Sequence, residues 1–275
     1  MSEIIAIANQ KGGVAKTITT HNIAVGLAMR GKKVLMVDLD SQASLTISAG
    51  MEPSDTADNS IVSVLTDEPG RKRDIRECIH PVEVGEKGQF PQEYCYIIPS
   101  IIDLADLEWK MFARVSRELI LSRALEPIKA DYDYIVIDCP PQLSILTINA
   151  LSCANGVIIP VKTDYLSYRG LTHLNDTIAS IQTLTNPGLK VYGVVATFYE
   201  SRTKNGTAIL MELNREYNLI GIIPKTVLPA QGVYKGLSVV ELAPKHKMAH
   251  AYMDIVDMII SGKYERKGDI NDVEK

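Results

Sequence analysis

Short apolar runs alternate with helix-like stretches along almost the whole chain, and this alternation restricts the fold more than any other feature. The run "EIIAIAN" is followed by "TITTHNIAVGLAMRG", whose apolar spacing suits a helix, and then by a second apolar run, "KKVLMVDLD". A strand, a helix and a second strand in this order are typical of the parallel β-α-β unit. Because no linker interrupts the alternation, the sequence predicts an α/β fold: a doubly wound, mostly parallel sheet flanked by helices.

Five further strands are expected, at "YCYIIPS", "YDYIVIDCPPQ", "GVIIPVK", "LKVYGVVATFY" and "LIGIIPKT". The spacing predicts a long amphipathic helix over 104–128 and shorter ones in "GTAILMELNREY" and "KMAHAYMDIVDMII". Residues 50–93 are rich in glycine, proline and charge, which indicates an irregular excursion with one short helix near Ile61–Leu65. We therefore expect a single domain over 1–262 and a charged C-terminal tail over 263–275.

Composition restricts the class of protein. Of the 275 residues, 46% are hydrophobic and 23% charged, so the chain can bury a large core. The formal charge is −4, and any nucleic-acid binding must therefore come from a local basic patch. The four cysteines have no C-x-x-C spacing, which favours reduced thiols. The start "MSEIIAIANQ" is unlike a secretory signal, and no apolar run approaches the roughly 20 residues of a membrane span, so we expect a cytoplasmic protein.

The stretch "NQKGGVAKTITT" lies directly behind the first apolar run and has the residues of a phosphate-binding loop. Gly12 and Gly13 allow the backbone to turn tightly and approach an anion. Lys16 is placed to neutralise phosphates, and the Thr17 hydroxyl to ligate Mg²⁺. The strict pattern G-x-x-x-x-G-K-[ST] is not met, because other residues occupy both glycine positions. Taken alone, the pattern fits a solvated loop equally well.

Acids at the ends of neighbouring strands favour the phosphate-binding interpretation. Asp138 follows the apolar run "YIVI", where a carboxylate that holds Mg²⁺ through its waters is expected. Asp38 and Asp40 end the strand of "VDLDSQ", and Asp38 is a possible further metal residue. If that strand continues to Asp40, both acids share one face. A turn after Leu39 would instead re-aim the second acid.

The chain as a whole resembles a known family. "KGGVAKT" matches the deviant Walker A pattern K-G-G-x-x-K-[ST], and "DLDSQ", "VIDCPP", "PVKTDYLSYRGL", "TFYESRTK" and "GIIPKT" follow in the order typical of the ParA/Soj branch of the ParA/MinD ATPases. These matches span roughly residues 3 to 260. The resemblance implies a P-loop NTPase fold, ATP and Mg²⁺ as cofactors, slow Mg-dependent ATP hydrolysis and an ATP-bound sandwich homodimer. The chain looks like the short, Soj-like type.

The resemblance also implies roles for individual residues. Lys11 would reach the partner subunit's phosphates, as an arginine finger does, while Lys16 would hold those of its own subunit. Asp40 would position or activate the attacking water. Thr17 would bind Mg²⁺, supported by Asp138. The expected ATP contacts are Lys11, Gly12, Gly13, Val14, Ala15, Lys16, Thr17 and Ile18 in the loop, with Pro224 and Thr226 near the adenine.

Three residues depart from the family pattern. Ala15 stands where glycine is frequent, Ile18 where a second threonine is frequent, and Ser41 where proline is usual. An L-residue in the left-handed region costs roughly 1–2 kcal/mol, so Ala15 is expected to weaken or slow the nucleotide cycle if the backbone there is left-handed. Ile18 keeps its N–H but has no hydroxyl, and Ser41 is expected to loosen the segment after Asp40.

The partners implied by the resemblance are nonspecific double-stranded DNA and a ParB-like centromere-binding protein that stimulates hydrolysis. Arg202 matches one arginine that the family uses for DNA, whereas Leu228 stands at the second arginine position. Cations must face the DNA phosphates, and the lysines that could compensate are Lys204, Lys225, Lys235, Lys245 and Lys247. The expected function is DNA partition, for plasmid or chromosomal cargo, at the nucleoid.

Other functions of the same fold remain open. One is a ParA-like positioning ATPase for a cargo other than DNA, and another a MinD-like membrane-associated ATPase. Since the chain ends in the acidic "GDINDVEK" and a MinD-like protein needs a basic amphipathic C-terminal helix, no membrane partner is expected. A metabolic ligase or reductase of this fold and a scaffold without hydrolysis are the remaining alternatives.

Overall fold

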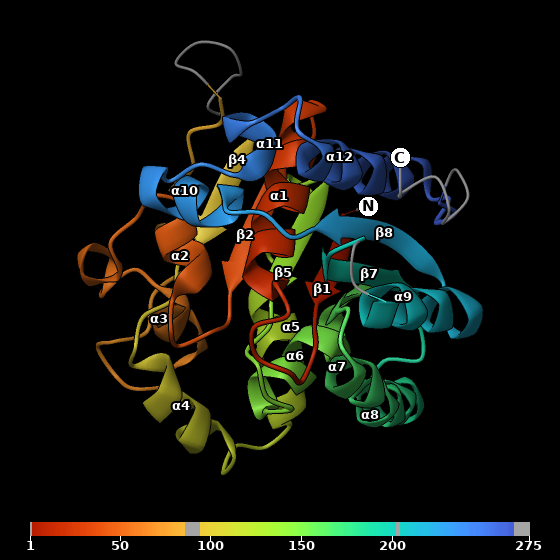
Figure 1. The fold of residues 1–275 in the computed structure, drawn as a ribbon. Coiled ribbons are helices and arrows are strands. Elements are labelled where there is room, and N and C mark those ends of the chain that lie inside the picture. The colour runs from red at the N-terminus through yellow and green to blue at the C-terminus, as the bar shows by residue number, and fades with distance from the viewer. Residues whose placement is uncertain (1, 86–93, 202–203, 267–275) are drawn as a thin grey trace.

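The computed structural model describes residues 2–85, 94–201 and 204–266, which form one eight-stranded sheet with helices on both faces (Figure 1). The strand order is β3-β4-β2-β5-β1-β6-β7-β8, and every neighbouring pair is parallel except β3 and β4. The strands are β1 (Glu3–Ile7), β2 (Val34–Asp38), β3 (His80–Pro81), β4 (Cys95–Ile98), β5 (Tyr134–Asp138), β6 (Gly156–Lys162), β7 (Lys190–Tyr199) and β8 (Leu219–Pro224). The predicted fold class is confirmed.

Helices connect the strands and cover the sheet. They are α1 (Lys16–Met29), α2 (Ser44–Ser48), α3 (Ile61–Leu65), α4 (Leu104–Met111), α5 (Ile120–Leu125), α6 (Ile145–Cys153), α7 (Tyr165–Arg169), α8 (Leu171–Leu184), α9 (Lys204–Glu216), α10 (Leu228–Lys235), α11 (Val239–Leu242) and α12 (Lys247–Ser261). The short helix expected near Ile61–Leu65 is confirmed as α3. No helix among the described residues combines the length and apolarity that a membrane crossing requires.

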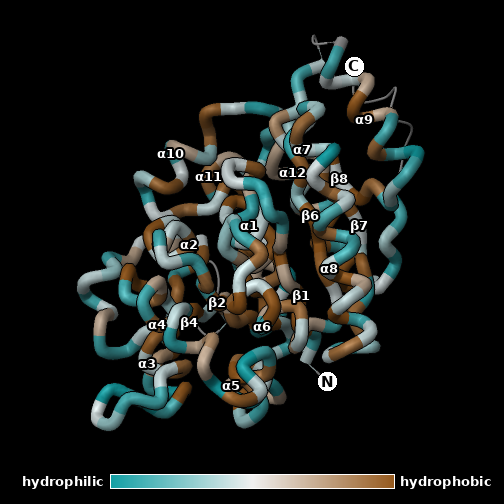
Figure 2. The backbone as a smooth tube through the Cα atoms, turned by 90° about the horizontal axis from the view of Figure 1, so that it is seen from below, coloured by the Kyte–Doolittle hydropathy of each residue, from teal (hydrophilic) through white to brown (hydrophobic). Residues whose placement is uncertain are grey.

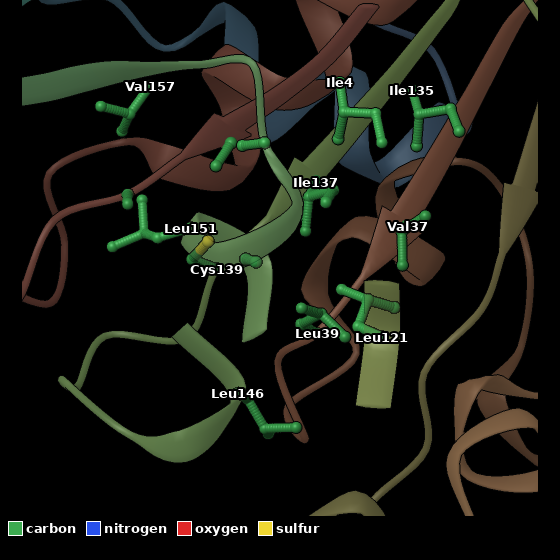
Figure 3. Close-up of a cluster of buried hydrophobic side chains, with 14 of the residues drawn as sticks. Ile4, Val37, Leu39, Leu121, Ile135, Ile137, Cys139, Leu146, Leu151 and Val157 are labelled. Carbon is green, nitrogen blue, oxygen red and sulfur yellow. The ribbon is translucent and has the colours of Figure 1, made fainter. Parts of the chain in front are cut away.

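Two hydrophobic clusters lie on opposite faces of the sheet, because successive strand residues point to opposite sides. Ile5 and Ile7 of β1 pack in the cluster that α1, α11 and α12 cover. Ile4 packs in the other cluster, with Ile135 and Ile137 of β5 and residues of α5 and α6 (Figure 3). Figure 2 shows hydrophobic residues concentrated along the strands and the inward faces of the helices. The central position of β1 places the loop that follows it at the middle of the sheet edge.

The prediction of one long helix over 104–128 is wrong. Helix α4 ends at Met111, and α5 begins only at Ile120 after a 3₁₀ turn over Arg117–Leu119. Ser116 has a φ of 51°, a left-handed backbone that cannot continue an α-helix. The apolar spacing nevertheless continues across the break, which is why periodicity predicts one helix. The antiparallel edge strand β3 was also not expected, because it lies within the excursion over 50–93.

Candidate phosphate-binding site

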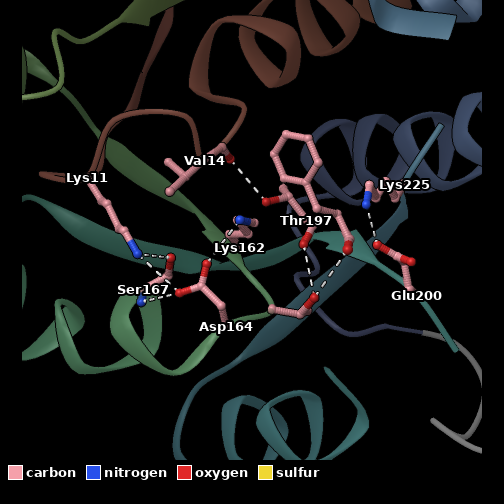
Figure 4. Close-up of polar contacts among 10 residues, drawn as sticks. Lys11, Val14, Lys162, Asp164, Ser167, Thr197, Glu200 and Lys225 are labelled. Atoms are coloured by element: carbon pink, nitrogen blue, oxygen red, sulfur yellow. Dashed lines mark hydrogen bonds and ion pairs between the residues drawn. The ribbon is translucent and has the colours of Figure 1, made fainter. Parts of the chain in front are cut away.

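The loop between β1 and α1 is anchored at both ends to neighbouring strands. Asn9 Nδ2 donates to the Pro160 carbonyl at 2.7 Å, and Asn9 Oδ1 accepts from the Lys11 N–H at 3.0 Å. Beyond the glycines, Thr197 Oγ1 of β7 donates to the Val14 carbonyl at 3.1 Å (Figure 4). These contacts hold the loop in its curled shape without a ligand.

Two residues of the loop have left-handed backbones. Gly13 has a φ of 69° and Ala15 a φ of 67°, so the condition under which Ala15 was expected to be unfavourable is met. Ala15 is also the residue before α1, and its side chain forms no capping hydrogen bond. The first N–H groups of α1 therefore lack a side-chain cap, and uncapped N–H groups at a helix start can bind an anion.

Lys16 lies beneath the loop rather than in solvent. It is 7% exposed, and its Nζ donates to the Lys11 carbonyl at 3.1 Å. Burial lowers the pKa of Lys16, while the nearby Asp138, Cys139 and Asp40 raise it. An ammonium group in this dry position is favourably placed to hold an anion.

Asp138, at the end of β5, is fully buried against the first turns of α1. Its Oδ2 accepts from Thr17 Oγ1 at 2.7 Å, and its Oδ1 from Thr20 Oγ1 at 3.2 Å. Burial and the neighbouring Asp38 carboxylate raise the pKa of Asp138 to about 8. Thr20 was not predicted as a site residue, although Thr20 follows Thr17 by three residues and so lies on the same face of the helix. A buried carboxylate beside a threonine hydroxyl is a donor set of the type that Mg²⁺ prefers, so these residues fit the ion.

Asp38 faces inward beside Asp138, because the two residues are register partners on β2 and β5. Asp38 Oδ1 accepts from the Asp40 N–H at 3.1 Å. Asp38 Oδ2 accepts from the Thr46 N–H and Oγ1, at 2.9 and 2.8 Å. Burial outweighs these bonds and raises the pKa of Asp38 to about 6. Asp38 thus holds the segment 40–46 in place through Thr46, a residue that the sequence analysis missed.

Asp40 does not share the inward direction of Asp38. Strand β2 ends at Asp38, and the turn that follows lies at Ser41 and Gln42, beyond Asp40. The Asp40 carboxylate is partly exposed, and its Oδ1 accepts from the Gln42 N–H at 3.0 Å. The strand does not continue to Asp40, so the shared face considered for this pair does not occur.

Lys11 leaves the loop on its outer side and contacts α7. Its Nζ lies 3.1 Å from Asp164 Oδ1 and donates to Ser167 Oγ at 2.9 Å (Figure 4). Asp164 also caps α7 by accepting from the Ser167 N–H, and lies 3.3 Å from Lys162 Nζ. Partial burial would raise the pKa of Asp164, but the bonds from Ser167 and Lys11 outweigh it and hold the pKa at about 2. The sequence analysis did not identify Asp164 or Ser167.

The remaining predicted ATP contacts are more widely spread. Ile18, in the first turn of α1, is half-buried and packs against the core. Pro224 ends β8 at the same edge of the sheet, and Thr226 Oγ1 accepts from the Leu228 N–H at 3.4 Å. No hydrogen bond among the described residues joins Pro224 or Thr226 to the phosphate loop.

The predicted DNA-binding cations are also dispersed. Lys225 forms an ion pair with Glu200 at 2.6 Å (Figure 4). Three of these lysines are exposed and form no ion pair with the rest of the described chain. Lys235 is at the end of α10, Lys245 lies just before α12, and Lys247 is its first residue. Lys204 begins α9, and Arg202 lies outside the described residues.

Comparisons with known proteins agree on one family. A family described as "AAA domain" matches residues 2–191. The chain is 36% identical to the sporulation initiation inhibitor protein Soj of Bacillus subtilis, over 93% of this chain and 97% of that protein. It is 32% identical to the chromosome partitioning protein ParA of Myxococcus xanthus, over 92% and 86%. Among solved structures, cobyrinic acid a,c-diamide synthase from Mycobacterium smegmatis with bound ADP and magnesium has a TM-score of 0.80 at 33% identity, covering 98% of this chain and 100% of that one.

Proposed function

The chain belongs to the ParA/MinD family of P-loop ATPases, with Soj and ParA proteins among its relatives, and we propose that it is an ATP-dependent DNA partition ATPase. ATP and Mg²⁺ are its cofactors. The observation that carries the proposal is the division of labour between two lysines on one loop. Lys16 lies inside the loop, whereas Lys11 points out of it toward α7. A second lysine outside its own phosphate site suits an active site completed by two subunits.

The proposed reaction assigns each residue a task. The loop N–H groups and Lys16 bind the phosphates, and Asp40 orients the attacking water. Thr17 would bind Mg²⁺, Asp138 would support the ion through its waters, and the ion would supply positive charge to the phosphates when bound. Lys11 of each subunit stabilises the transferring phosphate of the other in a sandwich dimer.

The proposal extends to DNA and to a protein partner. Exposed Lys235, Lys245 and Lys247, together with Arg202 and Lys204, would contact the phosphates of nonspecific duplex DNA in the ATP-bound dimer. A ParB-like protein would stimulate an otherwise slow ATPase. The protein would then be cytoplasmic and associated with the nucleoid. A positioning ATPase for a cargo other than DNA is the alternative, in which the same cycle operates without DNA binding.

The similarity to a diamide synthase raises a second candidate, a ligase that uses glutamine as its nitrogen source. Such chemistry requires a reactive thiolate. Burial raises the pKa of all four cysteine thiols, to about 11 for Cys78, to about 12 for Cys95 and Cys153, and well above the usual thiol value for Cys139. No described thiol suits that role, which favours the partition ATPase.

Nucleotide-dependent DNA binding tests the proposal. With Mg²⁺ and ATP the protein should dimerise and bind duplex DNA of arbitrary sequence, with an affinity that falls steeply with salt. Equal DNA binding with ADP and ATP would contradict it. Arg202→Glu should abolish DNA binding and spare nucleotide binding. Lys190→Glu, at the opposite edge of the sheet, is the matched control and should leave both unchanged.

Two further variants test the active-site roles. Lys16→Ala should abolish ATP binding or dimerisation. Asp40→Ala should retain the ATP dimer but lower turnover by about 10²-fold or more, as expected for loss of a group that orients the nucleophile. Unchanged hydrolysis in this variant would remove Asp40 from the proposed role.

A further inference from the structure

An apolar surface along α4 and the residues that flank it is exposed to solvent: Trp109 is in the helix, Ile102 precedes it and Phe112 follows it. Ile102, Trp109 and Phe112 are 65%, 78% and 44% exposed, and the two aromatic rings lie 6.0 Å apart. With Asp106 they form what we call the α4 stripe, since residues 102, 106 and 109 repeat at helical spacing. The opposite face of α4 is buried in the core through Leu104, Leu107 and Met111. The stripe is therefore not the inward side of a loosely packed helix.

An acidic group lies in the middle of this apolar surface. Asp106 is exposed and forms no hydrogen bond or ion pair with any part of the chain that the structure describes. Lys110 Nζ donates to Glu68 Oε1 at 2.5 Å. Lys110 forms no hydrogen bond with Asp106, and the two side chains interact only through their charges. A lysine or arginine from outside could pair with Asp106 and lie over the Trp109 ring. An anionic membrane surface would instead repel this carboxylate.

The stripe continues into a pocket that contacts the Asp40 segment. Ile102 is one wall of this pocket of about 960 Å³, and Ser41, Gln42 and Ala43 form another. The Ala43 N–H donates to the Asp40 carbonyl at 2.9 Å, and Ala43 has a strained φ of 52°. A side chain that entered the pocket would thus touch the turn that orients Asp40. Figure 1 shows α4 at the same end of the sheet as the phosphate loop.

We propose that the α4 stripe and this pocket form one docking surface for a segment of a partner protein that presents apolar side chains and a lysine or arginine. The apolar side chains cover Ile102, Trp109 and Phe112, and the cation pairs with Asp106. Docking changes the rate of ATP hydrolysis through the turn over Ser41–Ala43. This last effect rests on the proposed ATPase function, whereas docking itself does not.

The experiment uses a displayed library of random peptides, selected on the full-length protein and on a Trp109→Ser/Phe112→Ser variant. Peptides enriched only on the unmodified protein should carry apolar residues together with lysine or arginine. Their affinity should fall about tenfold in Asp106→Lys, as expected for reversal of one charge pair. Leu184→Ser, which changes an equally exposed apolar residue on α8, is the control and should bind them normally. Trp109 is the only tryptophan, so its emission should shift to the blue on binding.

Three outcomes would overturn the proposal. The first is equal enrichment on the protein and its stripe variant, and the second is enrichment of acidic or uncharged peptides. The third is a blue shift of the Trp109 emission that appears without peptide as the protein concentration rises, at concentrations where the protein has the mass of a dimer. In that case a second copy of the chain would cover the stripe. Peptide binding should persist in Lys16→Ala, which separates a failure of docking from a failure of the ATPase function.

Discussion

Lys11 Nζ lies 3.1 Å from Asp164 Oδ1 of the same chain, so the lysine proposed to serve the partner subunit is held by its own helix α7. Ser167 Oγ accepts a second hydrogen bond from the same ammonium group. To reach across a dimer, Lys11 must first leave both groups. The contact would therefore oppose the proposed dimerisation.

Asp164→Asn should strengthen ATP-dependent dimerisation. Asparagine keeps the cap of α7 but removes the charge that holds Lys11. A partly exposed ion pair contributes about 0.2–1 kcal/mol, and each of the two subunits releases one such pair, so the dimerisation constant should rise by up to about thirtyfold. Sedimentation at several protein concentrations measures this. The control is Lys162→Met, which removes the other cation beside Asp164 and should not raise the dimerisation constant. If Asp164→Asn weakens the dimer instead, the contact between Lys11 and Asp164 is not inhibitory.

Ala15→Gly should stabilise the protein. Glycine adopts the left-handed backbone at position 15 without the penalty of about 1 kcal/mol that alanine incurs. The melting temperature should rise by about 2–4 °C per kcal/mol in a domain of this size. Ala24→Gly, in the middle of α1, is the matched control and should lower it. A lower melting temperature for Ala15→Gly would mean that the left-handed backbone costs less than the added chain entropy.

Thr46→Val should destabilise the protein strongly, although valine has nearly the same shape as threonine. It removes a hydrogen bond to the buried Asp38 carboxylate and leaves the Ser100 N–H without its acceptor, Thr46 Oγ1. The expected loss is about 2–4 kcal/mol in the free energy of unfolding, measured by urea denaturation. Thr56→Val is the control, because Thr56 donates only to the neutral Pro53 carbonyl and should lose about 1 kcal/mol. Equal losses in the two variants would contradict the anchoring role of Asp38.

The stability of the nucleotide-free protein should fall as the pH rises from 6.5 to 8. The folded-state pKa of Asp138 is raised to about 8, so the folded chain keeps a proton there that the unfolded chain has already released. Each retained proton gives a slope of about −1.4 kcal/mol per pH unit, hence a loss of about 1–2 kcal/mol over this window. Urea denaturation at several pH values measures it.

Other groups restrict where this effect is visible. Burial lowers the pKa of His21 to about 4, so His21 makes the folded protein less stable as the pH falls below 6.5. Asp38, with its pKa raised to about 6, acts in the opposite direction over much of the same range. Above pH 6.5 the titrations of His21 and Asp38 are largely complete, so the slope due to Asp138 is seen with little contribution from them. Asp138→Asn should flatten the profile there, and a profile that keeps its slope would assign the titration to another group.

The sequence was sufficient for the parallel strands of the sheet, though not for the edge strand β3, because buried parallel strands appear as continuous apolar runs such as "YIVID". It was insufficient where the backbone changes direction without a change in apolar spacing. The break at Ser116 is one such place, and the end of β2 at Asp38, two residues before Asp40, is another.

Within the site, the residues of the loop itself were predictable because they are adjacent in the chain. Contacts across long separations were not. Asp164 lies 153 residues from Lys11, and the pattern around it is equally compatible with an ordinary helix start. The left-handed backbone at Ala15 was expected only conditionally, since the residue type alone does not reveal its φ angle.

The anchoring of the phosphate loop by Thr197 has a consequence for biosynthesis. Although the loop is among the first segments to leave the ribosome, its flanking strands β5 and β6 and its anchor on β7 come much later. A nascent chain that ends before Thr197 lacks the hydrogen bond to Val14, so the loop has no stable curl in which to receive a nucleotide. The protein should therefore acquire its ligand only late in translation, after most of its length has been made.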